Sequence, residues 1–494
     1  MKSNSDILRS ELSPFESYPK GWSQLMAWVY PNSYELGMSN IGYQWLLYIL
    51  KSQGHLLVER FFASHRSSDK SLESNRSIKE FPIIAMSMPF EMDILNFLGF
   101  LYRNGIPLLA SDRPDGPLIV GGGNAFTLNP FPFSDFFDII IPGCGEEWAE
   151  TFPEILRELP PGLVPKEKIL DEIAEIPGVW IPLRDDGSVI QRSSCIRKNP
   201  AFTPILTSYG HFRNMFLIEL QRGCPFRCSF CSSNWLERPF ENYSIDSIVK
   251  IYTEHGQDAK RIGVVGNAVA EHPHLGEIID YFSERGARVS PSSIRFDRLN
   301  EPISDKLAST GIRTLTFAPE TASKELAKNI SKWIDIEDII QYANVASKKG
   351  FRELKLYWII GLPKEQDDDV IELANAIKKI DSSPGISLSC SINTFIPKPH
   401  TKFQYEFMFS DSEIKRRIKL LKANIGSKTS AKIEFNYSRQ SRISAILSIG
   451  GSEITPVLKR IAEGGGIKTS FAGYGIDINA AIFGDENAPW ERII

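Results

Sequence analysis

Short apolar stretches that predict β-strands alternate with amphipathic stretches that predict α-helices along most of this chain. Parallel strands need a long crossover between them, and that crossover is usually a helix. The alternation therefore predicts parallel sheets with helices packed on their faces. In the first block the predicted strands are residues 25–30, 81–88, 118–120 and 137–141, and the predicted helices are residues 40–51, the stretch up to 101, and 146–156.

The same alternation returns in a second block between residues 216 and 428. All of its predicted strands except the last are followed by a stretch compatible with a helix, and such units can close part of a β/α barrel. The residues between the blocks predict a linker, and the tail from residue 433 predicts a lid or a small subdomain. The predicted barrel strands are residues 216–220, 261–265, 288–290, 314–317, 353–360 and 387–394.

Composition favours an intracellular globular protein without membrane segments. The polar residues 1–14 carry no secretory signal, and no apolar run reaches the roughly 18 residues that a spanning helix needs. We therefore expect a cytoplasmic protein with no membrane partner. The net charge of −4 gives no general attraction to nucleic acid or to anionic lipid.

A group of three cysteines, Cys224, Cys228 and Cys231, directly follows the first predicted barrel strand and the residues Gln-Arg-Gly. Because the spacing is tight and all three ligands are thiols, the group suits an iron–sulfur cluster. A 4Fe–4S cluster has four irons, so three cysteines leave one iron open for a substrate or cofactor. The sequence predicts a 4Fe–4S site with an open iron.

Two other interpretations of the cysteine group remain open. Structural zinc would need a fourth ligand, for which His211 is the nearest histidine, and the spacing is unusual for zinc. A non-catalytic iron–sulfur protein for electron transfer or sensing would normally close its cluster with a fourth cysteine. The other three cysteines, Cys144, Cys195 and Cys390, are predicted to be buried small apolar residues.

The cysteine segment, with Phe230 just before the last cysteine, resembles the cluster loop of the radical S-adenosylmethionine (SAM) superfamily. The resemblance implies that Cys224, Cys228 and Cys231 hold a 4Fe–4S cluster whose open iron chelates the amino and carboxylate groups of SAM. It implies an external one-electron donor such as flavodoxin or ferredoxin. The product implied is a 5′-deoxyadenosyl radical that acts on an unknown substrate.

Several later positions look like the SAM contacts of that superfamily. Glu320 and Thr321 resemble the polar pair after the fourth barrel strand, and Lys332 stands where a lysine is common. Gly361 resembles the turn that packs on the adenine. Asn267 stands where relatives carry a Gly-Gly-Glu-like turn for the SAM amino group, which is a departure. Alternatively, Glu320 is a charge at a helix N-terminus and Gly361 an ordinary turn glycine.

The first block resembles the cobalamin-binding domain that precedes many radical SAM barrels. Ser87 and the run Gly121, Gly122 and Gly123 follow predicted strands where relatives cradle the nucleotide tail of cobalamin. The cobalamin-ligating signature Asp-x-His-x-x-Gly is absent. Two interpretations stay open: a domain that binds cobalamin, and a domain that keeps the fold as a scaffold or substrate platform.

Together these resemblances imply a Rossmann-like cobalamin-binding-type domain at residues 1–185, a linker at 186–213, a partial (β/α)6 TIM-like radical SAM barrel at 214–428 and a small C-terminal region at 429–494. The function implied is radical modification of an unknown substrate, with cobalamin-assisted methylation as one form of it. A methylthiotransferase-like enzyme acting on tRNA or protein is disfavoured, because those enzymes carry three more cysteines in the N-terminal domain and residues 1–190 hold only Cys144.

Lysines and arginines between residues 415 and 432 form a basic stretch that could contact RNA phosphate. The apolar residues Ile414, Ile418 and Leu421 have helical spacing and favour a solvated helix face instead. We therefore do not expect nucleic acid as a partner.

Overall fold

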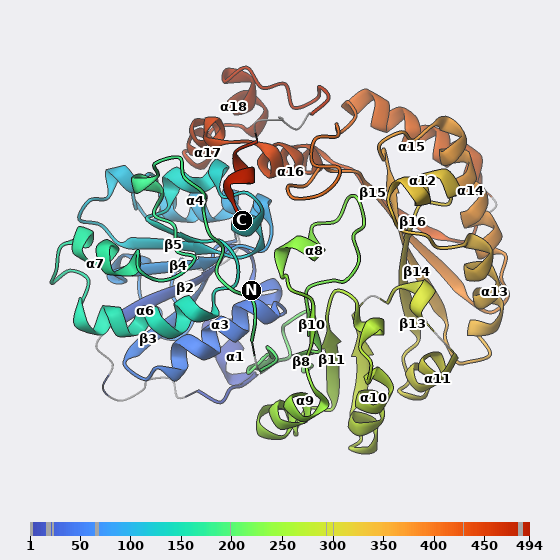
Figure 1. Cartoon of the computed structure of the whole chain (residues 1–494), viewed down its shortest axis with the longest axis horizontal. Coiled ribbons are helices and arrows are strands. Elements are labelled where there is room, and N and C mark those ends of the chain that lie inside the picture. Colours follow the sequence, from blue (N-terminus) through green and yellow to red (C-terminus); the bar gives the residue numbers. More distant parts are fainter. Residues whose placement is uncertain are drawn as a thin grey trace.

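The computed structural model describes residues 3–15, 21, 24–64, 69–197, 199–292, 294–299, 301–427, 429–482 and 488–494. It places an N-terminal sheet domain beside a partial barrel (Figure 1). This confirms the predicted α/β fold with a parallel sheet followed by a barrel region. None of the described helices is long and apolar enough to cross a bilayer.

Five parallel strands in the order β3-β2-β4-β5-β6 form the N-terminal sheet. Helices cover both faces of the sheet, and the central strand β4 is buried throughout, as expected when helices pack on both sides. The elements are α1 (Asn4–Arg9), β2 (Gln24–Tyr30), α2 (Tyr34–Gly37), α3 (Ile41–Ser52), β3 (Leu56–Phe62), β4 (Ile83–Ser87), α4 (Ile94–Arg103), β5 (Leu118–Gly122), α5 (Asn124–Leu128), β6 (Ile139–Ile141), α6 (Glu146–Glu158) and α7 (Lys166–Ile173).

The edge strand β3 was not predicted, although all seven of its residues are buried. Its centre carries Glu59 and Arg60, which interrupt the apolar run. In the structure Arg60 forms ion pairs with Glu11 at 2.8 Å and Glu73 at 2.7 Å, and Glu59 forms one with Arg76 at 3.2 Å. Charged residues become compatible with a buried strand only when such partners reach them.

Seven strands in two parallel sheets form the partial barrel, in the orders β12-β11-β8 and β13-β14-β15-β16. The last of them, β16, pairs with β15 and lies beyond residue 428, where the predicted barrel ended. The elements are β8 (Phe216–Glu219), β9 (Gln221–Arg222), α8 (Ser233–Leu236), β10 (Glu241–Asn242), α9 (Ile245–Ile251), β11 (Arg261–Val265), α10 (Leu275–Glu284), β12 (Arg288–Pro291), α11 (Glu301–Ser309), β13 (Thr314–Glu320), α12 (Lys324–Asn329), α13 (Ile336–Ala346), β14 (Glu353–Ile360), α14 (Asp367–Asp381), β15 (Ser387–Thr394), α15 (Asp411–Ile425) and β16 (Lys432–Asn436).

The C-terminal helices α16 (Arg439–Ile449), α17 (Thr455–Ala462) and α18 (Ile467–Gly473) lie against the N-terminal domain rather than continuing the barrel (Figure 1). Leu458 and Trp490 share one hydrophobic core with Phe97 and Leu101 of α4. The chain therefore returns after the barrel to cover the α4 face of the first sheet. This return brings α16 close to the ends of the barrel strands.

The expectation for two of the scattered cysteines was wrong. Cys144 and Cys195 form a disulfide, which joins the turn after β6 to the segment that leads into the barrel. Backbone contacts hold the two segments together, since the Ser193 N–H donates to the carbonyl of Pro142 at 2.9 Å. The pairing depends on this tertiary contact, which the sequence separation of 51 residues gave no reason to expect. Cys390 is a free, buried cysteine, as predicted.

Candidate functional site

The three clustered cysteines lie on one loop at the mouth of the partial barrel, between β9 and α8. Cys224, Cys228 and Cys231 are all free and partly exposed. A guanidinium nitrogen of Arg295 lies 3.7 Å from the Cys228 sulfur. Figure 1 shows α8, which follows the loop, between the N-terminal domain and the barrel. The helix that follows the cysteine loop therefore lies where the two parts of the chain meet.

Hydrogen bonds fasten the middle of the cysteine loop to the C-terminal end of α12, the helix that follows β13. The Ser229 N–H donates to the Ile330 carbonyl at 2.8 Å, and the Ser229 hydroxyl donates to the Asn329 carbonyl at 2.9 Å. Phe230 packs on an apolar cluster that includes Phe395 and Phe403. Phe230 therefore helps to hold the loop and to keep water from one side of it.

The chemistry of the loop fits a cluster better than a single ion. Burial raises the pKa of the Cys224 and Cys228 thiols, and the cations Lys332 and Arg295 oppose that rise at Cys228. Positive groups beside thiols favour the thiolate form that binds metal. Among the described residues, no three His, Cys, Asp or Glu side chains are arranged to hold one metal ion. The zinc interpretation, which needed His211 as a ligand, gains no support from this geometry.

Glu320 ends β13 and pairs with Lys332 at 2.8 Å, and both side chains are buried. The Glu320 backbone has φ +69°, a left-handed conformation that is uncommon outside glycine. Burial raises the pKa of Glu320, and Lys332 opposes the rise. Thr321 is also buried, and its hydroxyl accepts a hydrogen bond from the Ser323 N–H at 3.2 Å. The fold thus brings the predicted Glu320 and Lys332 together close to Cys228.

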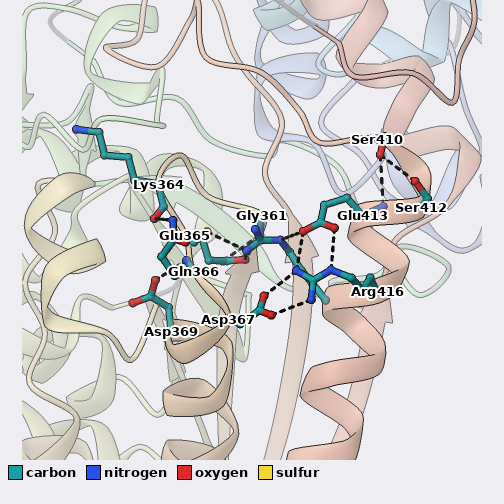
Figure 2. A network of polar contacts seen from close by, with 11 residues as sticks. Gly361, Lys364, Glu365, Gln366, Asp367, Asp369, Ser410, Ser412, Glu413 and Arg416 are labelled. Carbon is teal, nitrogen blue, oxygen red and sulfur yellow. Dashed lines mark hydrogen bonds and ion pairs between the residues drawn. The ribbon is translucent and has the colours of Figure 1, made fainter.

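Gly361 lies in a turn that a buried carboxylate holds in place (Figure 2). Its N–H donates to both carboxylate oxygens of Glu365, at 2.9 and 3.0 Å, and its φ is +80°. Arg417 from α15 pairs with the same carboxylate at 2.7 Å. Burial raises the pKa of Glu365, and the Gly361 N–H and Arg417 oppose that rise. The turn is therefore shaped by an ion pair that the sequence analysis did not identify.

The basic stretch in α15 is largely paired within the chain. Arg416 contacts Asp367 at 2.7 Å and Glu413 at 2.8 Å, as Figure 2 shows. Ile414 and Leu421 are buried on the opposite side of the helix. This arrangement agrees with a helix packed by its apolar stripe.

Replacing Glu365 with alanine is expected to lower the free energy of unfolding by about 3 kcal/mol, because it removes the buried carboxylate that pairs with Arg417 and leaves that guanidinium only the partly exposed Glu413. The same change releases the Gly361 turn, which the sequence resemblance predicts to contact SAM, so SAM affinity is expected to fall as well. Denaturant titration and equilibrium SAM binding measure the two effects. The matched control is Asp368→Ala on the exposed start of α14, which should change neither quantity. Equal stability of the two variants would contradict the assigned role of Glu365.

Asn267 follows β11, and its side-chain amide donates to Glu237 at 3.2 Å. The Gly223 N–H, next to Cys224, donates to the same carboxylate oxygen at 3.3 Å. Burial raises the pKa of Glu237, and the nearby Glu219 adds to the rise. An acid therefore does lie at the end of β11, but it comes from the end of α8. The sequence analysis missed it, and its only sequence signal is its position soon after Cys231.

A cavity of about 220 Å³ lies where the carboxyl edge of the N-terminal sheet faces β8. Ser87, Gly122 and Gly123 line it, as predicted for a ligand-binding edge. Gly121 does not: a Cβ there would come within 2.6 Å of the Phe126 ring, so this glycine serves internal packing. Of the four residues predicted to contact a ligand, Ser87, Gly122 and Gly123 therefore lie on the cavity wall and Gly121 lies in the core.

Buried charges cross this cavity from the barrel to the N-terminal domain. Arg222 pairs with Glu146 of α6 at 2.6 Å and with Glu219 of β8 at 2.9 Å. Glu237 also lines the cavity. One guanidinium therefore joins acids from both parts of the chain.

The segment around His400 lies against the cysteine loop. The His400 ring stacks on Trp235 of α8 with centroids 3.5 Å apart, and burial lowers the His400 pKa to about 3. The Arg192 guanidinium also lies over the Trp235 ring, 4.3 Å from its centroid. His400 is thus a packed histidine.

Comparison with known proteins decides the family. The model described as "Radical SAM proteins, N-terminal" matches residues 42–182, and the model described as "Radical SAM superfamily" matches residues 218–377, which include all three clustered cysteines. This chain belongs to the radical SAM superfamily. Membership implies a 4Fe–4S cluster and SAM as cofactors, and it confirms the family resemblance found in the sequence.

Relatives of this radical SAM protein include an uncharacterized protein of Methanocaldococcus jannaschii, 28% identical over 440 residues that cover 88% of this chain and 90% of the relative. An uncharacterized methyltransferase of Pyrococcus horikoshii is 26% identical over 172 residues, covering 33% of this chain and 37% of the relative. A solved structure with a similar fold is the radical SAM methyltransferase TsrM of Kitasatospora setae, with TM-score 0.52 and 16% identity over 78% of this chain and 76% of that one.

Proposed function

We propose that this radical SAM protein binds its cluster through Cys224, Cys228 and Cys231 and cleaves SAM reductively to start radical chemistry on a bound substrate. The observation that carries the proposal is three free cysteines on one anchored loop at the barrel mouth, beside Arg295 and Lys332. When bound, the cluster supplies one electron to the sulfonium of SAM, which breaks the C5′–S bond into methionine and a 5′-deoxyadenosyl radical.

The side chains around the loop have distinct tasks. Arg295 and Lys332 hold positive charge near Cys228 and so stabilise its thiolate. Glu320 keeps Lys332 in place, and the Gly361 turn offers a rigid wall at the end of β14. Phe230 and its apolar neighbours keep water from the loop. An external one-electron donor such as flavodoxin or ferredoxin would supply the electron needed for each SAM cleavage.

Anaerobic reconstitution with iron and sulfide, followed by SAM and dithionite, tests the proposal. We expect a 4Fe–4S absorbance and release of 5′-deoxyadenosine and methionine in equal amounts. A cluster that forms while SAM stays intact and unbound would contradict the proposal and favour an electron carrier.

Cobalamin-assisted methyl transfer is a second candidate, favoured by the cavity at the sheet edge. Gly122 leaves it open, since a Cβ there would be 3.8 Å from the nearest atom, and the indole N–H of the buried Trp148 has no hydrogen-bond partner among the described residues. Ser87, Gly122 and Gly123 would hold the nucleotide tail, and bound cobalamin would supply a methyl carrier. The similar TsrM fold was solved with cobalamin and a [4Fe-4S] cluster bound.

A variant that fills the cavity distinguishes a domain that binds cobalamin from one that serves only as a scaffold or substrate platform. We expect the wild-type chain to retain hydroxocobalamin through gel filtration and the variant Gly122→Leu to lose it. The variant should still cleave SAM, because Gly122 belongs to β5 of the N-terminal sheet and none of the three clustered cysteines lines the cavity. Absence of retained cobalamin from the wild-type chain would favour the platform.

A further inference from the structure

A second, larger cavity of about 1240 Å³ lies where three parts of the chain meet. Its walls come from the carboxyl edge of the N-terminal sheet, the ends of β15 and β16, and the C-terminal helices. Ligands of parallel α/β sheets and barrels bind at such carboxyl ends. Residues that represent each wall are Asn32, Asp93, Asn393, Asn436 and Ser444.

The charges that line this cavity are paired, with one exception. Lys398 pairs with Glu91 at 2.6 Å, and Arg103 pairs with Asp69 at 3.1 Å. Asp93 accepts a hydrogen bond from the Asn32 amide at 2.8 Å, and no ion pair to it is found in the described part of the chain. Its residue is only 6% exposed. A carboxylate held in this way lacks a countercharge, which is costly in a buried position.

The Asp93 side chain is not used to cap the helix that follows it. Asp93 ends a 3₁₀ turn (Glu91–Asp93) that continues into α4 with helical backbone angles, φ −68° and ψ −16°, and its side chain makes no capping hydrogen bond. A capping residue normally has an extended backbone, so no cap is expected at this position. The carboxylate lines the cavity instead.

Aromatic side chains supply the other main feature of the cavity. Phe90 and Tyr102 line it and are 46% and 49% exposed, which is high for rings of this size. Phe435 and Tyr437 line it from β16 and the residue after it. Exposed rings around one buried acid suit a ligand with a flat apolar part and a positive end.

The cavity adjoins the turn at Gly361. Thr394 ends β15 and lines the cavity, and a Cβ on Gly361 would lie 3.8 Å from the Thr394 hydroxyl oxygen. That hydroxyl is buried and has no hydrogen-bond partner within the described part of the chain. A molecule in the cavity would therefore lie next to the wall proposed for SAM.

We propose that this cavity binds the substrate, that the substrate carries a cationic nitrogen beside a flat apolar part, and that Asp93 anchors that nitrogen. The proposal rests on the proposed radical SAM function. An ammonium or guanidinium group donates charge-assisted hydrogen bonds, which are about twice as strong as neutral ones. Asp93 touches the substrate through these bonds and sets the class of substrate accepted.

Binding of matched probes to the reconstituted full chain tests this site. The cationic probes are 2-phenylethylamine and phenylguanidine, and the neutral probe is 2-phenylethanol. Binding of each probe is measured by ligand-detected NMR titration. We expect the wild-type chain to bind at least one cationic probe about tenfold more tightly than the alcohol, which corresponds to 1.4 kcal/mol. Asp93→Asn should remove this preference, and the exposed control Asp112→Asn should keep it. Equal binding of all three probes to the wild-type chain would overturn the proposal.

The pH dependence of the preference for cationic probes tests whether Asp93 is the acid that binds them. Burial raises the pKa of Asp93 to about 6. The groups that face it are Glu91 on its own turn, whose pKa is lowered by Lys398 despite burial, and Tyr30 of β2, whose pKa is raised by burial. Only Asp93 among them changes charge between pH 5 and 8. The preference for the cation should therefore disappear as pH falls through about 6, and its persistence at pH 4.5 would overturn the assignment to Asp93.

The SAM assay separates failure of the site from failure of the function. If wild-type protein prefers the cation but produces no 5′-deoxyadenosine, the cavity assignment stands and the radical function is wrong. If SAM is cleaved and no probe preference exists, the function stands and the cavity assignment is wrong.

Discussion

Replacing Cys228 with alanine is expected to abolish both cluster assembly and 5′-deoxyadenosine formation. Each clustered cysteine would hold a different iron, so the loss of one thiolate leaves an iron without its protein ligand. Cys228 lies beside two cations, with Arg295 at 3.7 Å and the Lys332 charge acting on its thiol. Iron and sulfide analysis after reconstitution, with product quantification by mass spectrometry, measures both losses.

The matched control is Cys390→Ala, which removes a buried free cysteine from β15. It should keep the cluster absorbance and the wild-type rate of SAM cleavage. If Cys228→Ala still yields 5′-deoxyadenosine at the wild-type rate, the assignment of the cluster to this loop is wrong.

Replacing Arg222 with methionine is expected to lower the free energy of unfolding by about 3–5 kcal/mol, because breaking a buried ion pair leaves its partners uncompensated. Arg222 is 7% exposed and compensates Glu146 and Glu219, which come from the N-terminal domain and the barrel. Glu237 adds a third acid to the same cavity wall. The variant therefore leaves acids facing one another across the join between the two parts of the chain.

Denaturant titration measures the loss, and two further variants interpret it. Arg288→Met on β12 removes an exposed arginine and should change stability by no more than about 0.5 kcal/mol. Adding Glu146→Gln and Glu219→Gln to Arg222→Met should restore most of the stability, since the uncompensated charges are then gone. If the triple variant is no more stable than Arg222→Met, lost packing rather than charge explains the effect.

Strand prediction succeeded where apolar residues form a run or alternate with polar ones. β11, β14 and β15 begin and end at the predicted residues. Among the strands of the three larger sheets, β3 and β16 were missed, and both carry charged residues near their centres. β3 depends on ion pairs to Arg60 from residues that lie elsewhere in the sequence, and β16 is a half-exposed edge. A local sequence pattern shows neither the distant ion-pair partners that β3 needs nor the neighbouring strand on which β16 pairs.

The sequence by itself determined the cysteine loop, the family and the two-part α/β fold, because short-range spacing and periodicity encode ligand sets and strand–helix order. Only the tertiary structure decided which groups converge on the site. Three contacts join residues far apart in the sequence: Glu237 with Asn267, Arg222 with Glu146, and Asp93 with Asn32. These groups matter to the site because they are buried and lie close to other charged or polar groups, and both properties depend on the tertiary fold.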